Sequence, residues 1–487
     1  MSVLKKLAGQ TAIYGLSSIV GRLLNFLLVP LYTSIFVPQE YGLLSVLMSL
    51  VAFAMVVLTY GLETSFFHFS TKEKNAGKVF STGVFSLLAT SLLFIAIVIP
   101  QSQLIANFLH IPNYPVFVEF LAIVLVLDSF SSLPFALLRL QNRPLKFAFI
   151  KLLSIASNIG LNLFFYLLCP YLLKSGIAVD YITMVYDPAF GIGYIFIAYL
   201  VSSSLSLLFL LPELFKMKFS FDFKLWKSMI SYGFPLLIGG LAYVVNEMVD
   251  RVLLEYLLPA EIATTQVGIY AACYKISIFM TLFIQAFRYG AEPFFFAQAK
   301  EEGAQKQYAN VMRYFVAFTG LIFLAVNVYI DIVKEFIRDE AYHEGLMIVP
   351  ILLFANLLLG VYYNLSVWYK VTEKTRYGAY LSIFGALITI GFNLLLIPSL
   401  SYMGSAWATL ICYASMCIAS YFVGRRYYPI PYNFTYLFSY LLLALGLYCI
   451  WLIIHDDYFV LSSLFCLVYM FTVLTLEKRK KRSNFIA

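Results

Sequence analysis

Three basic residues lie inside long apolar runs of the chain, where a charge needs either a partner or water. They are Arg22, Arg251 and Lys275. A charged side chain at the centre of a bilayer costs roughly 2.5–3.5 kcal/mol on insertion scales, so it usually faces an opposite charge or a wet cavity. A guanidinium can also bind two phosphate oxygens at once. These residues are therefore the first candidates for binding an anion within a membrane.

Arg22 belongs to a polar face on the first apolar run. The residues that share this face, at spacings of three or four, are Tyr14, Ser18, Arg22 and Asn25. Spacings of three and four place side chains on one side of a helix. Because a polar stripe would be unfavourable against lipid, we expect this face to line a cavity. The alternative is an ion pair between Arg22 and Asp128, which lies at a similar depth in the fourth run.

A second charged cluster occupies the seventh apolar run. Glu247 precedes Arg251 by four residues, which is the favourable order for an ion pair on a helix. Asp250 points to another side and needs its own partner, which Lys275 in the eighth run could supply. The alternative is that Arg251 and Lys275 together form a cationic site for an anion.

The composition excludes a water-soluble fold. Of 487 residues, 62% are hydrophobic and 12% are charged, with a mean hydropathy of +0.86, whereas soluble domains carry roughly 25% charged residues. About 20 apolar residues span a bilayer as a helix. Runs of that order cover approximately 11–36, 41–67, 79–100, 115–139, 147–170, 190–212, 229–257, 266–290, 312–330, 346–369, 378–398, 402–423, 434–454 and 458–476. We therefore predict an all-α integral membrane protein of about 14 transmembrane helices.

The distribution of basic residues predicts the orientation. With the N-terminus in the cytoplasm, 27 of the 33 Lys and Arg residues fall in cytoplasmic segments and three in outside loops. The other three lie within helices. Cytoplasmic loops of membrane proteins carry an excess of Lys and Arg. Both termini are therefore predicted to be cytoplasmic, and the first run is expected to remain as a spanning helix.

Two short motifs recur and indicate a duplication. The pattern YGxExxFF occurs at 60–67 and again at 289–296, and the turn VPQE at 37–40 resembles LPAE at 258–261. Because the repeating unit has six helices, the two copies would share one orientation, and substrate sites form where such halves meet. We predict an N-terminal six-helix lobe, a cytoplasmic linker, a C-terminal six-helix lobe, and two additional helices with a basic tail, at 1–212, 213–228, 229–423 and 424–487.

The acidic residue of each repeated motif lies near the cytoplasmic end of its helix. These residues are Glu63 and Glu292. They are candidates for a cytoplasmic gate. For Glu292 a surface salt bridge with Arg288, four residues earlier, is the plainer explanation.

Other chemistries find no support in the sequence. The six cysteines and four histidines are scattered without the spacing of a metal site or a disulfide framework, so we expect neither metal nor cofactor. The chain contains no phosphate-binding loop of the GxxxxGK[ST] type. None of its loops is long enough for a separate catalytic domain. The pattern favours a transporter over an enzyme.

Several segments together resemble the polysaccharide flippases of the multidrug/oligosaccharidyl-lipid/polysaccharide (MOP) exporter superfamily. The matching segments are 12–18, 27–33, 38–42, 60–64, Asp250-Arg251, and 267–270 with Lys275. The nearest group is the Wzx-type flippases of O-antigen and capsule synthesis. No single motif is diagnostic, so the resemblance rests on the order and spacing of all of them.

The resemblance implies a fold, a substrate and a site. The fold would be two six-helix lobes around a cavity that opens alternately to each side. The substrate would be a polyprenyl-diphosphate-linked oligosaccharide, flipped to the outer leaflet of a bacterial inner membrane. Arg22, with Arg251 and Lys275, would bind the diphosphate, and Asp128 or Asp250 would couple transport to a proton or sodium ion. Relatives that move the peptidoglycan precursor have more basic cavities, which favours a surface polysaccharide here.

Two alternatives come from other functional classes. A multidrug cation antiporter of the same superfamily would use an acidic cavity, and the acids near Arg251 leave the balance of charge open. A membrane enzyme of polysaccharide assembly, such as a polymerase or ligase, would need a large outside loop with catalytic groups. The sequence has no such loop.

Overall fold

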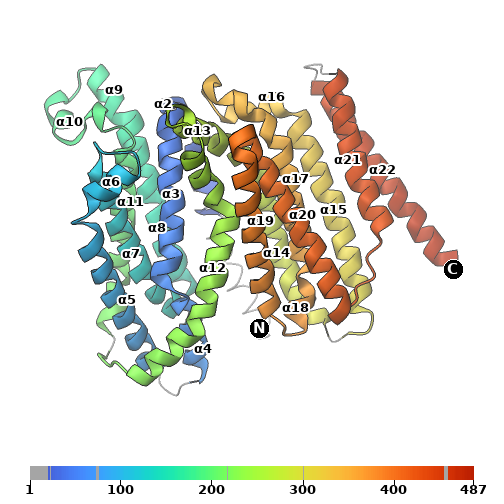
Figure 1. Ribbon diagram of the computed structural model, residues 1–487, viewed down its shortest axis with the longest axis horizontal. Helices are drawn as coiled ribbons and strands as arrows, with labels where there is room; N and C mark the ends of the chain where they lie inside the picture. Colours follow the sequence, from blue (N-terminus) through green and yellow to red (C-terminus); the bar gives the residue numbers. More distant parts are fainter. Residues whose placement is uncertain are drawn as a thin grey trace. The chain divides into compact units, whose positions relative to one another are not determined.

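Helices form all the regular structure in the described part of the chain (Figure 1). The computed structural model describes residues 20–21, 23–72, 76–216, 218–299, 301–454 and 459–486, with backbone only for 459 and 480–486. Because lipid offers no hydrogen bonds, a spanning segment must satisfy its backbone groups internally, and a helix does so within one segment. This is the physical reason that so apolar a chain folds as helices.

The chain divides into two units, and two long helices contribute to both. Unit 1 comprises Met1–Leu28 and Leu47–Val244, and unit 2 comprises Val29–Val46 and Val245–Ala487. Helix α3 (Pro38–Thr59) begins in unit 2 and ends in unit 1, whereas α12 (Phe223–Leu257) begins in unit 1 and ends in unit 2.

Unit 1 is organised around α7. Its other helical elements are α4 (Leu62–Lys72), α5 (Ala76–Val98), α6 (Ser102–Phe108), α7 (Pro115–Leu140), α8 (Pro144–Leu163), η1 (Phe164–Leu168), α9 (Cys169–Lys174), α10 (Val179–Val185), η2 (Pro188–Phe190) and α11 (Gly193–Phe215). Helix α7 packs against α5 and α11, and α11 also packs against α8. A fully buried apolar cluster fills the space between α4, α5, α7 and the start of α12, and includes Phe66, Leu87, Leu133 and Met229.

Ion pairs fasten the helix ends of unit 1. Lys78 of α5 lies 2.6 Å from Asp222, which precedes α12. Glu213 of α11 is paired with Lys146 at 2.6 Å and with Arg143 at 3.2 Å, both at the start of α8. The first pair joins α5 to the start of α12, and the second joins α11 to the start of α8.

Unit 2 contains the remaining helices. They are α2 (Leu28–Ile35), α13 (Ala260–Ile276), α14 (Ile278–Gln298), α15 (Ala304–Val328), α16 (Ile330–Val333), η3 (Lys334–Phe336), η4 (Glu340–Ile348), α17 (Val349–Leu365), α18 (Val367–Val371), α19 (Arg376–Leu400), α20 (Tyr402–Tyr427), α21 (Phe434–Ile454) and α22 (Phe459–Ile486). Helix α20 packs against α17 and α19, and α15 packs against α17, α21 and α22. The segment around α2 is bound to this unit by the Tyr342 hydroxyl, which donates to the Phe36 carbonyl at 2.6 Å.

The last two helices are fastened to α15 by a buried ion pair. Arg313 of α15 lies 2.8 Å from Glu477 of α22, and the Tyr440 hydroxyl of α21 donates to the same carboxylate at 2.5 Å. Because a charged pair in an apolar setting needs such additional hydrogen bonds, the three residues favour one fixed packing of α21 and α22 on α15.

The predicted membrane-spanning architecture is confirmed. Twelve helices among the described residues are long and apolar enough to cross a membrane, and α13 with α14 forms a thirteenth span with a 47° bend. Each predicted run from the second to the fourteenth corresponds to one of these spans. The described part of the first run is the shorter apolar helix Leu23–Ile35.

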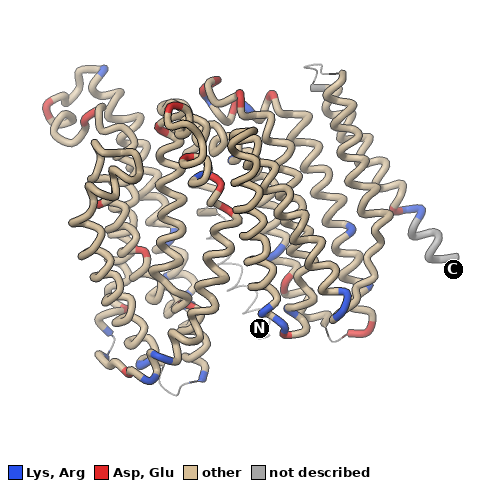
Figure 2. The backbone as a smooth tube through the Cα atoms, in the orientation of Figure 1, with Lys and Arg blue, Asp and Glu red and all other residues tan. Residues whose placement is uncertain are grey.

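The predicted lobes and linker stay predictions. Helix α11 ends at Phe215 and α12 begins at Phe223, so both helices extend into the predicted linker at 213–228. The orientation of the termini also stays a prediction. Figure 2 shows how basic residues gather at helix ends, in unit 1 near the starts of α5 and α12 and in unit 2 beside α18. This is the pattern expected where helices meet the inner membrane surface.

Candidate functional site

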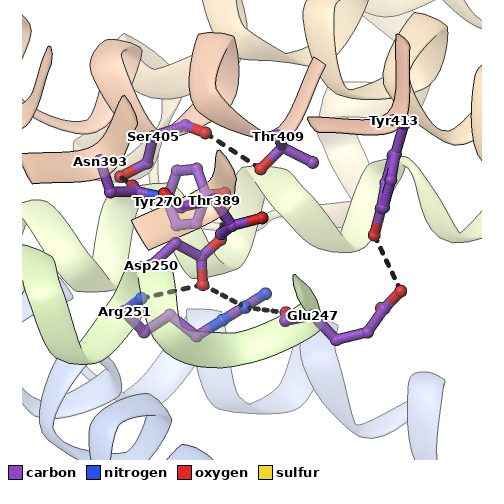
Figure 3. Close-up of polar contacts among 9 residues, drawn as sticks. All are labelled: Glu247, Asp250, Arg251, Tyr270, Thr389, Asn393, Ser405, Thr409 and Tyr413. Atoms are coloured by element: carbon purple, nitrogen blue, oxygen red, sulfur yellow. Dashed lines mark hydrogen bonds and ion pairs between the residues drawn. The ribbon is translucent and has the colours of Figure 1, made fainter. Parts of the chain in front are cut away.

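A cluster of charged and hydroxyl side chains lies within unit 2, where α12 packs beside α13 (Figure 3). The Arg251 guanidinium lies 2.8 Å from an Asp250 carboxylate oxygen, and the other oxygen accepts a 2.5 Å hydrogen bond from the Tyr270 hydroxyl. Asp250 is 4% exposed and Arg251 is 8% exposed. The two charges therefore neutralise each other inside the unit.

The prediction that Glu247 pairs with Arg251 is wrong. Arg251 donates instead to the main-chain carbonyl of Glu247 at 2.7 Å, and its carboxylate partner is Asp250. The Glu247 carboxylate accepts a hydrogen bond from the Tyr413 hydroxyl of α20 at 2.9 Å. Arg251 also packs against the Tyr274 ring, 4.5 Å from its centroid. Contacts from α13 and α20, which helical spacing alone does not reveal, decide this pairing.

Lys275 lies in the last turn of α13, immediately before the bend into α14. It is half-buried and forms no hydrogen bond or ion pair with any residue that the structure describes. The prediction that it pairs with Asp250 is therefore wrong. Arg251 lies close enough to Lys275 to repel it. The carbonyl end of α13 offers Lys275 partial compensation, because the helix dipole is negative there.

A separate set of hydrogen bonds joins Asn246 of α12 to α19 and α20, and within α19 the Asn393 amide donates to the Thr389 carbonyl at 2.8 Å. The Thr389 hydroxyl donates to the Asn246 side chain at 3.2 Å, and the Ser405 hydroxyl donates to the Asn393 side chain at 2.9 Å. Thr409 extends the set by donating to the Ser405 carbonyl at 3.0 Å. All five residues are buried. Sequence reasoning missed this network, although Thr389 and Asn393, like Ser405 and Thr409, recur at a spacing of four.

Unit 1 places Asp128 among polar neighbours of its own. Asp128 is near the middle of α7, and Lys151 of α8 and Ser203 of α11 are the residues that influence its charge. Both Asp128 and Lys151 have exposed side chains. The proposed partner Arg22 lies outside the described residues, so the alternative ion pair with Asp128 stays a prediction.

The two glutamates of the repeated motif occupy corresponding ion pairs. Glu63 of α4 pairs with Arg139 at the end of α7. Glu292 of α14 pairs with Lys370 of α18 at 2.7 Å, and with Arg288 at 3.5 Å as predicted. In a repeat of six helices, the second and fourth spans correspond to the eighth and tenth. Each glutamate of the motif is thus paired with a basic residue of its own unit.

The remaining candidates of the first helix are placed only in part. Tyr14, Ser18 and Arg22 lie outside the described residues. Asn25 is exposed, within the apolar helix Leu23–Ile35. Over the described ranges there is no group of three His, Cys, Asp or Glu side chains that could hold a metal ion.

Comparisons with known proteins identify a matching family and solved structures of similar fold. The sequence profile of a family described as polysaccharide biosynthesis proteins matches residues 7–289. No curated protein sequence matches the chain. Among solved structures, the lipid II flippase MurJ in an inward closed conformation is similar with a TM-score of 0.76 at 13% identity, covering 96% of this chain and 98% of that one.

Two further solved structures belong to transporters of the MOP superfamily. An inward-facing MATE family transporter of the MOP superfamily gives a TM-score of 0.66 at 14% identity, covering 83% of this chain and 94% of its own. A MOP superfamily transporter from Pyrococcus furiosus, described by the reverse polarity of its binding pocket, gives 0.52 at 14% identity, covering 86% and 94%. At these identities the likeness establishes the fold.

Proposed function

This chain belongs to the polysaccharide biosynthesis protein family, and we propose that it is a transporter of the MOP superfamily that flips a polyprenyl-diphosphate-linked oligosaccharide. Movement would run from the cytoplasmic to the outer leaflet of a bacterial inner membrane by alternating access. The oligosaccharide would serve surface polysaccharide synthesis, as O-antigen, capsule or exopolysaccharide.

One observation carries the proposal. Lys275 has no anionic partner among the described residues, although it lies in a membrane-spanning segment and beside a second cation, Arg251. An unpaired ammonium at such a place is costly unless water or an anion reaches it. The diphosphate of a polyprenyl-linked sugar would supply that anion. Arg251 stays paired with Asp250, so it would lie beside the diphosphate without adding a net charge.

The bend beside Lys275 fits the same role. Transporters commonly bind substrates where a spanning helix is interrupted, because backbone groups and helix ends are accessible there. The 47° break between α13 and α14 falls at Ser277, two residues after Lys275. The Ser277 side chain is fixed by Asn356 of α17, whose amide donates to it at 3.0 Å. The site would therefore be held in a defined geometry.

The proposal also gives roles to the first helix, to two aspartates and to the two glutamates of the repeated motif. Arg22, with Tyr14, Ser18 and Asn25 on its face, would add to the cationic lining. Asp250 or Asp128 would couple transport to a proton or sodium ion. Glu63 and Glu292 would form the cytoplasmic gate, since each would release a basic partner when the cytoplasmic side opens. The diphosphate needs this polar route because it cannot cross hydrocarbon unaided.

The test is leaflet exchange of a labelled polyprenyl-diphosphate oligosaccharide in proteoliposomes. We expect exchange to require the protein and to fall about tenfold or more in Lys275→Met, because a charged hydrogen bond contributes about 1.5–3 kcal/mol. Arg22→Ala should show a similar loss. Lys306→Met, which changes an exposed lysine at the start of α15, is the matched control and should retain wild-type exchange.

The proposal fails on either of two results. Normal exchange in well-folded Lys275→Met would remove the diphosphate site from this position. Absence of exchange with several such glycolipids, together with efflux of an organic cation such as ethidium, would identify a multidrug antiporter instead.

A further inference from the structure

A second group of charged side chains lies within unit 1, and the diphosphate site does not account for it. Asp128 lies near the middle of α7 and forms no ion pair with any described residue. Its side chain is exposed although the span is otherwise apolar. Because a bare carboxylate is unfavourable against lipid, this exposed face of unit 1 must be polar or wet.

Lys151 of α8 accompanies Asp128 on this face. Lys151 is also exposed, and it forms no ion pair with any carboxylate in the described ranges. Its ammonium lies 4.3 Å from the centroid of the Phe135 ring. Asp128 and Lys151 influence each other's charge without touching. Thus an acceptor and a donor lie in the same region of unit 1, and neither forms an ion pair within the described ranges.

Hydroxyl and amide groups from two helices complete the surroundings. Ser203 and Tyr199 of α11 lie beside Asp128, and Tyr199 also neighbours the Asn158 side chain of α8. The Asn158 carbonyl oxygen is held by the Asn162 amide at 2.7 Å. The group therefore combines one carboxylate, one ammonium, two hydroxyls and an amide, with an aromatic ring beside the ammonium.

This combination suits a neutral ligand that both donates and accepts hydrogen bonds. A carboxylate accepts from two adjacent hydroxyls, and an ammonium donates to several oxygens. A metal cation at Asp128 would be repelled by Lys151, and a bare anion at Lys151 would be repelled by Asp128. Sugar rings carry neighbouring hydroxyl groups that meet both requirements.

We propose that Asp128, Lys151 and Tyr199 form a glycan subsite in unit 1, which binds hydroxyl groups of the transported oligosaccharide. The inference rests on the proposed function, and it concerns the sugar alone, while the diphosphate stays with Lys275. Asp128 would then be a specificity-determining residue, and coupling to an ion would fall to Asp250.

The test compares two ligands on the purified full-length protein, polyprenyl diphosphate with and without its oligosaccharide. Asp128→Asn should weaken binding of the oligosaccharide-bearing ligand about tenfold or more, and change binding of the bare diphosphate by less than about twofold. Tyr199→Phe should weaken only the oligosaccharide-bearing ligand, by roughly two- to tenfold. Asp180→Asn, an exposed aspartate of α10, is the control and should change neither.

Each contrary outcome has a distinct meaning. Equal loss of both ligands in Asp128→Asn and Tyr199→Phe, or no loss of either, would overturn the subsite. Unchanged glycan binding with a lost response to a sodium or proton gradient would assign Asp128 to ion coupling. If wild-type protein binds neither ligand, the proposed function itself fails. If Lys275→Met loses the bare diphosphate while Asp128→Asn has no effect, only the subsite fails.

Discussion

Gly42 and Gly268 meet where the start of α3 crosses α13, and the two backbones touch there. A Cβ at Gly42 would lie 1.8 Å from the Thr264 carbonyl oxygen, and a Cβ at Gly268 would lie 1.8 Å from the Pro38 carbonyl oxygen. Both residues belong to unit 2. Small residues permit such close crossings in membranes, where packing rather than the hydrophobic effect drives helix association.

Substitution of either glycine should therefore separate the helices. Gly42→Ala requires a backbone shift, so we expect a loss of at least about 1–3 kcal/mol of stability, as for overpacked sites. Gly446→Ala in α21 is the control, because no atom lies within 4 Å of its added Cβ. Thermal unfolding in detergent measures both. An unfolding temperature for Gly42→Ala equal to that of Gly446→Ala would refute the close crossing.

Each glutamate of the repeated motif is paired with a basic residue of its own unit, and for Glu292 this residue is Lys370. Lys370→Glu places two carboxylates together and should destabilise unit 2, whereas the double exchange Glu292→Lys with Lys370→Glu should recover part of the loss, because the new ammonium at position 292 would also lie beside Arg288. The coupling expected for a partly exposed pair is about 0.5–1 kcal/mol. A double-mutant cycle on unfolding temperature measures it, and zero coupling would contradict the pair.

The same cycle, read out as transport rate, tests the proposed gate. If Glu292 and its partner must separate in each transport cycle, Glu292→Gln should change the activation free energy of transport by more than it changes the free energy of unfolding. Glu63→Gln should act in the same direction, since Glu63 pairs with Arg139 at the corresponding place of unit 1. Unaltered transport in both variants would leave the two pairs a purely structural role.

Asp250 and Arg251 are both buried, so removing one partner should cost more than removing both. Asp250→Asn leaves the Arg251 charge without its carboxylate, which typically costs about 3–5 kcal/mol. Adding Arg251→Gln should reduce that loss. Glu247→Gln, which keeps a hydrogen-bonding partner for Tyr413, should cost no more than about 1 kcal/mol. The unfolding temperatures of the three variants measure these losses of stability. An unchanged unfolding temperature for Asp250→Asn would contradict the pairing of Asp250 with Arg251.

The spans could be predicted from the sequence because lipid imposes length and polarity on each helix separately. Runs of about 20 apolar residues and the clustering of basic residues between them are local properties. The i, i+4 ion pair of Arg288 with Glu292 was predictable for the same reason, since it depends on one helix only.

The partners of the buried charges could not be predicted, because they come from other helices. Spacing favours Glu247 for Arg251, but Tyr413 of α20 binds Glu247, and Tyr270 of α13 orients Asp250. The network from Asn246 to Thr409 likewise joins α12, α19 and α20. Single Asn, Thr and Ser residues in apolar runs carry no signal of which helix will face them.

Asp222 allows a prediction about acid, because it lies outside the spanning helices. Its carboxylate accepts from the Lys78 ammonium at 2.6 Å and from the Leu225 amide, in the first turn of α12, at 3.0 Å. The hydrogen bond with Lys78 and that from the Leu225 amide lower the pKa of Asp222 from its ordinary value of 3.8 to about 2. A lowered pKa stabilises the folded state above the ordinary pKa, and this contribution is lost as the pH falls through the folded value.

Asp222→Asn should therefore lower the unfolding temperature by a constant amount above about pH 4, and the difference from wild type should shrink between about pH 4 and about pH 2. Thermal unfolding across this range measures it. Asp180→Asn, at an exposed site on α10 away from any described ion pair, should show no such convergence. A difference for Asp222→Asn that stays constant down to pH 2 would show that the carboxylate's charge does not contribute through Lys78.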